Sequence, residues 1–348
     1  MARIWLRQFV FFLVTLGMAA LLYVLPLVYY VTHLNVHVGY GKILAGVVAV
    51  AVCIQLYLQT KITFRPLKWF VFFGMAAGFY GGLVSLVFVI LEQFMVVPVT
   101  VLMPVVLITL LAYGAWQGRQ IRLVPLHLAS NKLTTSHRLA FISDVHIGSQ
   151  PVSYLDRIMA EIKEQDVTAI LIGGDLIDNS GIDIHQITQF KHSPVPVFFV
   201  TGNHEYYLKD AQAKIAQLAD IGVDVIYNDV RRLGELQLVG LSDAQAPATQ
   251  LATLDGLPLG DAYSILMVHK PQLWPMVAGS VDLALSGHTH AGQMMPFHWL
   301  VQLQFKFYYG LYRHLDSNCY VSSGAGCWGP RIRIGSSNEI VILELTPK

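Results

Sequence analysis

Apolar residues in the first third of the chain form four long runs that contain no charged residue. The runs cover residues 9–31, 43–60, 69–91 and 95–116. Each is close to the roughly 20 residues that an α-helix needs to cross the hydrocarbon core of a bilayer. The first run is longer than the apolar part of a cleavable signal peptide, and no small-residue cleavage site follows it. The pattern therefore predicts a membrane domain of four transmembrane helices over residues 1–117.

The pattern changes after residue 138 to short apolar runs that alternate with helical periodicity. The runs cover residues 139–142, 169–172, 197–200, 265–268 and 283–285. Between the first two, apolar side chains recur at the spacing of an amphipathic helix, at Val152, Leu155, Ile158, Met159 and Ile162. Alternating strands and helices are typical of an α/β domain. We therefore expect a folded domain over residues 138–348, joined to the membrane domain by a linker at residues 118–137.

Composition agrees with this division. The 348 residues have a mean hydropathy of +0.52, and only 13% of them are charged, which is unusual for a chain without membrane spans. From Ser136 onward the chain carries 14 basic and 21 acidic residues. A negative domain does not suit a nucleic-acid backbone, so we expect no nucleic-acid partner. The three cysteines, Cys53, Cys319 and Cys327, form neither a disulfide framework nor a CxxC metal motif.

Basic residues beside the apolar runs predict the orientation of the membrane domain. Seven lie on one side of the predicted spans, and the other side has only Lys42 together with the acidic Glu92. Basic loops stay on the cytoplasmic side. We therefore expect a multi-pass protein of the bacterial inner membrane, with both termini and the C-terminal domain in the cytoplasm. The basic segment after the fourth run serves either this topology alone or the binding of anionic lipid headgroups.

Potential metal ligands follow every one of the five short apolar runs. A carboxylate or histidine after a single strand is usually a turn residue or a surface side chain. Here the ligand types recur at strand ends, where α/β folds place their sites. The residues are, in chain order, Asp144, His146, Asp175, Asn203, His204, His269, His288 and His290.

The order of these residues resembles the signature of the calcineurin-like metallophosphoesterases. The matching motifs are Asp144-Val-His146, Gly174-Asp175, Gly202-Asn203-His204-Glu205, His269 and Gly287-His288-Thr289-His290. The stretch at residues 321–333 is similar to the terminal strand region of bacterial members with several N-terminal spans. Ala291 departs from the glycine that those relatives often have after the last motif. The resemblance implies an α+β fold, a four-layer α/β-β/α sandwich, behind the four-helix transmembrane domain.

The resemblance also implies a centre of two divalent metal ions and a metal-dependent phosphoric ester hydrolase. The first ion would be bound by Asp144, His146 and His290, and the second by Asn203, His269 and His288. Asp175 would bridge them, because a carboxylate offers two oxygens and a negative charge between two close cations. Two such ions can stabilise the in-line displacement of a phosphoryl group. Imidazole, carboxylate and amide ligands suit manganese, iron or zinc, and we favour manganese.

The same resemblance assigns the catalytic residues. His204 would donate a proton to the leaving group, and Asp178 would orient it, since the spacing Asp175-Leu-Ile-Asp178 matches the aspartate that pairs with this histidine in related phosphatases. The alternative for Asp178 is a helix cap. Glu205 fits a supporting residue or a helix start better than a catalyst.

Three functions remain open. The first is hydrolysis of a phosphodiester, pyrophosphate or phosphomonoester in a lipid-linked or nucleotide-linked substrate at the cytoplasmic membrane face, such as the UDP-diacylglucosamine that relatives cleave. The second is a tethered phosphodiesterase of soluble nucleotides. The third is a membrane sensor or scaffold without turnover, which an intact ligand set disfavours. Oligomeric state does not follow from the sequence.

Residues 294–312 follow the last motif and are rich in methionine and aromatic residues, with Lys306 as the only charged residue. Two interpretations are open for this segment. It either contacts an acyl chain or the membrane surface, or it packs in the core of the domain, because apolar periodicity does not show what covers a face.

The orientation can be tested with reporters. We expect alkaline phosphatase fused after Lys348 to be inactive and a fluorescent protein at the same place to fold, because the basic residues hold this end in the cytoplasm. A phosphatase fusion at Glu92, on the opposite side, should be active and serves as the control. An active phosphatase after Lys348 would overturn the orientation.

Overall fold

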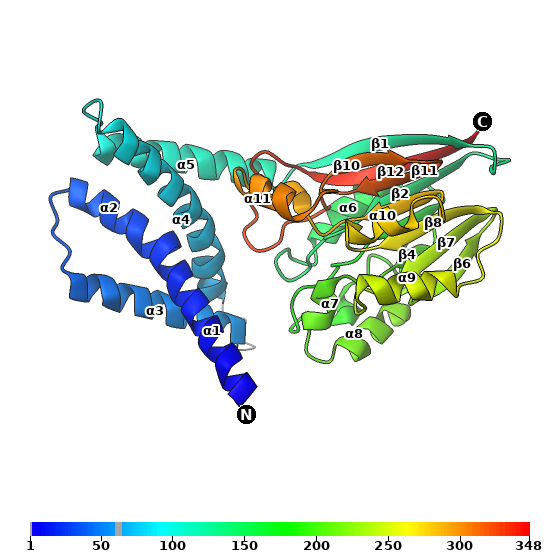
Figure 1. Ribbon diagram of the computed structural model, residues 1–348, viewed down its shortest axis with the longest axis horizontal. Coiled ribbons are helices and arrows are strands. Elements are labelled where there is room, and N and C mark those ends of the chain that lie inside the picture. Colours follow the sequence, from blue (N-terminus) through cyan, green and yellow to red (C-terminus); the bar gives the residue numbers. More distant parts are fainter. Residues whose placement is uncertain (1, 60–64) are drawn as a thin grey trace. The chain divides into compact units, whose positions relative to one another are not determined.

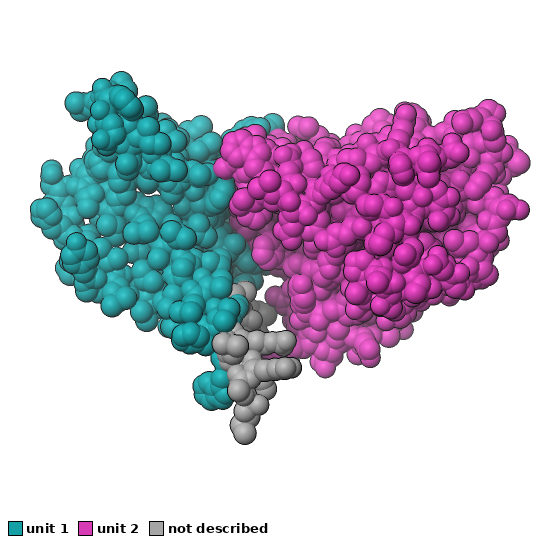
Figure 2. Space-filling view, in the orientation of Figure 1, with its two compact units in different colours: residues 1–116 teal, residues 117–348 magenta. Residues whose placement is uncertain are grey.

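A computed structural model describes residues 2–59 and 65–348 of the chain. Their contacts divide the chain into two compact units, residues 1–116 and residues 117–348, coloured separately in Figure 2.

The first unit is made of apolar helices. They are α1 (Ala2–Ala19), a π-helical turn (Ala20–Val24), α2 (Leu25–His33), α3 (Tyr40–Gln59), α4 (Arg65–Leu91) and α5 (Val99–Gln117). Four stretches in these helices are long and apolar enough to cross a membrane: Phe9–His33, Tyr40–Tyr57, Pro66–Leu91 and Val99–Gln117. The prediction of four membrane-spanning helices is thus confirmed in length and composition. Thr60, the predicted end of the second span, lies outside the described residues.

Close packing within this unit depends on small residues. A side chain at Gly78 on α4 would place its Cβ 1.2 Å from the carbonyl oxygen of Leu22 in the π-helical turn. One turn earlier, a Cβ at Gly74 would lie 2.1 Å from the ring of Tyr23. Glycine allows the backbones of apolar helices to approach closely, which is a common means of packing in membranes.

The second unit contains two six-stranded sheets (Figure 1). The order in the first sheet is β1 (Ile121–Ser130), β12 (Asn338–Pro347), β2 (His137–Ile142), β3 (Ala169–Ile172), β4 (Val197–Phe199) and β5 (Val223–Val225). The order in the second sheet is β10 (Gly310–His314), β11 (Ser317–Val321), β9 (Leu283–Ser286), β8 (Tyr263–Val268), β7 (Leu236–Leu241) and β6 (Asp229–Leu233). All five apolar runs of the sequence lie in or at these strands.

Helices cover the outer face of each sheet. The helices of this unit are α6 (Tyr154–Lys163), α7 (Asn203–Tyr207), α8 (Ala211–Gln217), α9 (Pro247–Asp255), α10 (Trp274–Val277) and α11 (Phe297–Gln304). Leu155 of α6 packs in one apolar cluster with Ala140 and Ile142, which point to the outer face of the first sheet. The expected four-layer α/β-β/α sandwich is confirmed.

Alternation of side chains along each strand builds the three apolar layers. Leu139 and Phe141 of β2 point between the sheets, where they share a cluster with Ile265 and Met267 of β8. Their neighbours along each strand point to the helices on the opposite face, because successive side chains of a strand alternate between faces. Every β2 residue from Leu139 to Ile142 is fully buried. This double burial explains why these strands appear in the sequence as continuous apolar runs.

The prediction of a linker over residues 118–137 was wrong. Residues Ile121–Ser130 form β1, which pairs in parallel with β12 along its whole length, from Ile121 beside Asn338 to Ser130 beside Pro347. Leu126 and Leu128 are buried between the sheets, with 6% and 8% of their surfaces exposed. The segment lacks a long apolar run because β1 is an edge strand whose other side chains are exposed or only partly buried.

The role of β1 gives a stability test. We expect Leu128→Ala to lower the free energy of unfolding of the C-terminal domain by about 2–5 kcal/mol, the usual cost of truncating a buried leucine. Urea unfolding of the full-length protein in detergent, followed by tryptophan fluorescence, measures this change. His127→Ala on the same strand is the control and should cost at most about 1 kcal/mol, because its imidazole is exposed and pairs only with Glu344 at the surface. Equal, small effects of both substitutions would mean that the segment behaves as a linker.

Candidate metal centre

The predicted ligands all lie at the carboxyl ends of strands. Strands β2, β3 and β4 are parallel in the first sheet, and β8 and β9 are parallel in the second. Parallel strands end at the same edge of a sheet, so the loops that follow them gather there. The structure brings the side chains of these loops together from both sheets.

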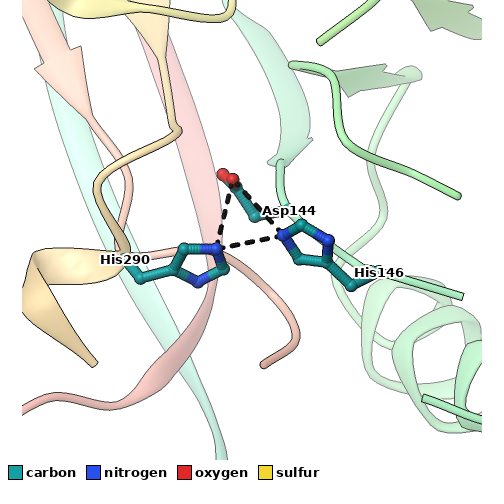
Figure 3. A group of neighbouring side chains, drawn as sticks. All are labelled: Asp144, His146 and His290. Atoms are coloured by element: carbon teal, nitrogen blue, oxygen red, sulfur yellow. Dashed lines mark hydrogen bonds and ion pairs between the residues drawn. The ribbon is translucent and has the colours of Figure 1, made fainter. Parts of the chain in front are cut away.

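One group of potential ligands is formed by Asp144, His146 and His290 (Figure 3). Their nearest ligand atoms all lie within 4.8 Å of one another. The Nε2 atoms of His146 and His290 are 3.0 Å apart, and that of His290 lies 3.5 Å from Asp144 Oδ1. Two imidazole nitrogens at this distance repel each other unless a proton or a cation lies between them. The three residues are those predicted for the first ion.

A second group is formed by Asp175, His269 and His288. His269 Nε2 lies 3.1 Å from Asp175 Oδ2 and 3.2 Å from His288 Nδ1. The other ring nitrogen of His269 is 2.8 Å from the carbonyl oxygen of Gly173, which can only accept a hydrogen bond. Nδ1 therefore carries a proton, and Nε2 is the nitrogen that faces the group. Such a backbone contact is typical of histidines that bind metals.

Asp175 lies between the two groups. Its Oδ2 atom is 3.1 Å from His269 Nε2 in one group and 4.0 Å from His146 Nε2 in the other. Burial opposes ionisation of this carboxyl, but the charge and hydrogen bond of His269 outweigh burial and lower the pKa of Asp175. In turn, burial disfavours the charged imidazole of His269, yet Asp175 raises its pKa to about 10. A negative carboxylate thus stands where a bridging ligand was predicted.

Asn203 is the predicted ligand that belongs to neither three-residue group. It is the first residue of α7, directly after the N-cap Gly202, and 9% of its surface is exposed. Its buried Oδ1 atom has no hydrogen-bond partner among the described residues. A buried polar atom without a partner is uncommon, and a metal ion held by Oδ1 would satisfy it. The donors present, which are imidazole, carboxylate and amide, therefore fit a divalent metal ion.

Burial keeps two of the candidate imidazoles neutral. It lowers the pKa of His288 to about 3, with help from the positive charge of His269. Burial and the charge of His146 lower the pKa of His290 as well. A neutral imidazole is the form that binds a metal, so neither residue has to lose a proton at neutral pH before binding.

Five of the predicted ligands have a left-handed backbone. The φ angles are 54° for Asp144, 55° for His146, 51° for Asp175, 74° for His288 and 51° for His290. This conformation costs about 1–2 kcal/mol for a residue with a Cβ atom. Such strain persists only where surrounding contacts impose it, and it is concentrated at functional sites.

Backbone hydrogen bonds between the loops impose this geometry. Asp144 N–H donates to Gly174 O, and His146 N–H donates to Asp175 O, both at 3.0 Å. The loop after β2 is thereby fastened to the loop after β3. The N–H of His288 donates to the carboxylate of Asp144 from the second sheet. These contacts hold the ligands of both sheets in one arrangement.

Glu205 supports the loop of Asp175 through hydrogen bonds to its backbone. It is buried and accepts hydrogen bonds from the N–H groups of Asp175, Ile177 and Gly202, at 2.8–3.0 Å. Burial and the nearby Asp175 charge raise the pKa of Glu205 to about 7, while the backbone donors oppose this shift. Its role agrees with the supporting residue expected from the sequence.

His204 lies at the edge of both groups, with 17% of its side chain exposed. Its Nε2 atom is 3.9 Å from Asp175 Oδ2. Asp178 is close to His146, at 3.6 Å between Oδ2 and Nδ1, and its carboxylate accepts hydrogen bonds from the N–H and hydroxyl of Ser149. His146, Asp178 and His204 also form a group of ligand atoms within 4.8 Å. Asp178 therefore lies beside His204, and the dyad stays a prediction.

Two exposed aromatic rings flank His204. The ring centroid of Tyr207 lies 5.3 Å from that of His204, and the centroid of Trp328 lies 5.9 Å from it. Trp328 is held by Gln293, whose amide accepts from the N–H of Trp328 at 3.0 Å and donates to its carbonyl oxygen at 3.0 Å. Neither ring could be predicted from the sequence, because an isolated aromatic residue in a loop belongs to no recurring pattern.

Arg333 was also not assigned. Its side chain is fully buried and donates to the carbonyl oxygens of His290, Ser323 and Gly326. It thereby fastens the loop after β11 to the loop that carries His290. A signal was present in the sequence, because Arg333 ends the stretch that resembles the terminal strand region of bacterial relatives.

Comparison with known families agrees with this geometry. The family model of the calcineurin-like phosphoesterases matches residues 137–292. This range contains every residue of the two groups of potential ligands. The chain therefore contains a calcineurin-like metallophosphoesterase domain, as the resemblance of its motifs indicated.

Particular relatives carry the same description. An uncharacterized metallophosphoesterase of Helicobacter pylori is 35% identical over 244 residues, which cover 66% of this chain and 64% of that protein. A protein of Danio rerio named transmembrane protein with metallophosphoesterase domain is 28% identical over 279 residues, or 71% of this chain and 62% of that protein. This chain thus spans less than two thirds of both relatives. An uncharacterized metallophosphoesterase of Aquifex aeolicus is 28% identical over 256 residues, covering 68% of this chain and 96% of that protein.

The position of Asp175 generates a test of metal binding. We expect Asp175→Asn to lose at least part of the bound metal in elemental analysis of the purified protein, because the amide removes a negative charge from between two groups of ligands. Activity should fall by more than the about 10–100-fold that follows loss of an outer partner of a ligand. The amide keeps the Oδ1 that accepts from His204 N–H, so the local backbone should be retained.

The matched control is Asp220→Asn, which changes an exposed carboxylate in the same unit. It should leave metal content and activity unchanged. Full metal occupancy together with near wild-type turnover in Asp175→Asn would contradict the bridging role.

Proposed function

We propose that this protein is a membrane-anchored phosphoesterase with two metal ions, which hydrolyses a lipid-linked or nucleotide-linked substrate at the cytoplasmic membrane face. The observation that carries the proposal is the position of Asp175, whose Oδ2 atom faces His269 of one ligand group and His146 of the other. One carboxylate with imidazoles on both sides suits two close cations better than a single ion.

The ligands would divide as the sequence suggests. Asp144, His146 and His290 would hold the first ion, and His269, His288 and Asn203 the second. Bound ions of this kind supply Lewis acidity toward phosphoryl oxygens and a nucleophile at neutral pH. The chain's own contribution is to fix the ligands on strained loops, so that little reorganisation is needed during the reaction.

His204 would donate the proton to the leaving group. Burial lowers the pKa of His204 to about 4, although the charges of Asp175 and Asp178 oppose this shift. The imidazole alone is therefore neutral near pH 7. A bound phosphoester brings a further negative charge close to the ring, which favours the protonated form. Proton donation by His204 would accordingly depend on the bound substrate.

Two features support a substrate with a bulky leaving group. Tyr207 and Trp328, whose rings both lie close to His204, expose 72% and 50% of their surfaces, and such rings can stack on a planar group or cover an apolar one. The four apolar helices support a substrate at the membrane. A tethered phosphodiesterase of soluble nucleotides would use the same rings, and direct assays of both substrate classes separate the two functions. Turnover of any phosphoester would exclude the sensor or scaffold.

The proposed role of His204 has a kinetic signature. We expect His204→Ala to retain its metal and to lose about 10²–10⁴-fold in kcat on alkyl phosphodiesters, because a poor leaving group needs protonation. The loss should be much smaller on bis(p-nitrophenyl) phosphate, whose leaving group is stable as an anion. Elemental analysis and the two assays are made on the same preparation.

His192→Ala removes an exposed histidine of the same unit and should leave both rates unchanged. Equal losses of His204→Ala on the two substrates would contradict proton donation. Loss of metal in this variant would instead make His204 a ligand.

A further inference from the structure

Helix α11 carries an exposed apolar face. Phe297, Trp299, Leu300 and Leu303 expose 47%, 59%, 58% and 85% of their surfaces, and Met295 before the helix exposes 45%. We call these five residues the α11 face. Clusters of exposed apolar side chains mark interaction sites in soluble domains, whereas single ones need no explanation. The segment at residues 294–312 is therefore not simply part of the core.

The opposite side of the helix is fixed in the domain. Val301 and Phe305 are buried, with 9% of each exposed. The ring of Phe305 contacts that of His288, with 5.4 Å between centroids. The helix is thus seated next to the candidate metal centre, and its exposed face belongs to a well-anchored element.

Hydrogen bonds connect the start of this segment to the end of the last apolar helix. Gln117, the final residue of α5, donates its side-chain amide to Ser336 O at 3.4 Å. The hydroxyl of Ser336 donates to Gln293 O at 2.9 Å, and Met295 N–H donates to Ile334 O at 2.8 Å. One loop, residues 333–336, therefore contacts both the end of α5 and the residues that lead into α11.

The chain has little length in which to leave the membrane before this point. Three residues separate Gln117 from the start of β1 at Ile121, a distance of at most about 14 Å. The side-chain amide of Asn338 donates to Gly118 O and Gln120 O, at 2.9 and 3.1 Å, which fixes these residues against the domain. The chain therefore enters the domain only a few residues after the end of α5, which is long and apolar enough to cross a membrane.

Exposed arginines surround the junction. Arg119 follows Gln117 by two residues, and its carbonyl oxygen accepts a hydrogen bond from Arg157 at 2.9 Å. Arg331 is exposed as well, and its Nε donates to Ser149 O at 3.4 Å. Partial burial and, to a smaller extent, the positive charge of Arg119 lower the pKa of Arg331. Clustered cations of this kind are favourable beside anionic lipid headgroups.

We propose that α11 is an interfacial helix, which inserts the α11 face into the bilayer crossed by the four apolar helices while the junction arginines bind lipid phosphates. An apolar face beside basic residues is the pattern of helices that lie in a membrane surface. Each exposed leucine or aromatic side chain that leaves water for the acyl region strengthens this binding. Burial of a few such side chains is enough to hold a domain that is already tethered.

The docking would hold the metal centre at a constant height above the bilayer. Helix α11 begins seven residues after His290, and Phe305, directly after the helix, contacts the ring of His288. The ligands of the second sheet would therefore move with the helix. This consequence rests on the proposed function: phosphoester groups at the bilayer surface would reach the centre, and their apolar tails would remain in the membrane.

Spin-label accessibility tests the docking without any substrate. The full-length protein, with Cys53→Ser to remove the half-buried cysteine of α3, receives a nitroxide at Leu303→Cys and is reconstituted in vesicles of phosphatidylcholine and phosphatidylglycerol. Power-saturation EPR compares collisions with oxygen and with a water-soluble nickel complex. We expect oxygen to dominate at this position, because oxygen concentrates in the acyl region.

The matched control is Leu315→Cys, which lies in the turn between β10 and β11 and exposes a similar 73% of its surface. The nickel complex should dominate there. Equal access of nickel to both labels would overturn the docking, as would a label at residue 303 that neither reagent reaches, since protein would then cover the helix. Because neither reading uses activity, the phosphoesterase proposal is judged separately on bis(p-nitrophenyl) phosphate.

Discussion

The pairing of one buried carboxylate with imidazoles from two sheets is the interaction on which the rest of the centre depends. Asp175 lies in the loop after β3 of the first sheet. His269 follows β8 of the second sheet, and its Nε2 atom lies 3.1 Å from Asp175 Oδ2. A charge in this position is costly unless groups of opposite sign surround it. The negative charge, which would destabilise an ordinary core, makes the carboxylate suitable for binding cations. Three backbone N–H groups that bind Glu205 hold the loop in place against this cost.

The four-layer architecture follows from double burial of short strands. Strands β2 and β8 have apolar side chains on both faces, so each needs a partner sheet on one side and helices on the other. The parallel strands of both sheets that precede the ligands then direct their carboxyl ends to one edge of the domain. The strained loops at that edge, such as Asp144 with φ of 54°, are stabilised by contacts between loops rather than by local preference.

Much of the fold and of the candidate site could be predicted because these features are local in the sequence. The continuous run at residues 139–142 reflects burial on both faces, and the ligands follow such runs directly. Strand β1 was missed because its partner, β12, lies at the other end of the domain and only Leu126 and Leu128 are buried between the sheets.

Contacts over long sequence distances account for the other differences. Arg333 acts through three carbonyl oxygens in two separate loops, which no spacing reveals. The closeness of Asp178 to His146 depends on how two loops pack. Whether α11 is covered could not be read from its apolar residues either, because its buried side, Val301 and Phe305, has the same chemistry as its exposed side.

Strand β12 has a further consequence for the order in which the domain is made. It lies between β1 and β2 in the first sheet, yet it is synthesised after the other strands of both sheets. Until it arrives, β1 has no partner in the sheet, and Leu126 and Leu128 remain uncovered beside a membrane helix that is already synthesised. Synthesis of residues 338–347 is therefore the event that closes the first sheet. Chains that stop short of residue 338 would present an unpaired apolar strand to chaperones and proteases, which gives the cell a means of removing incomplete copies.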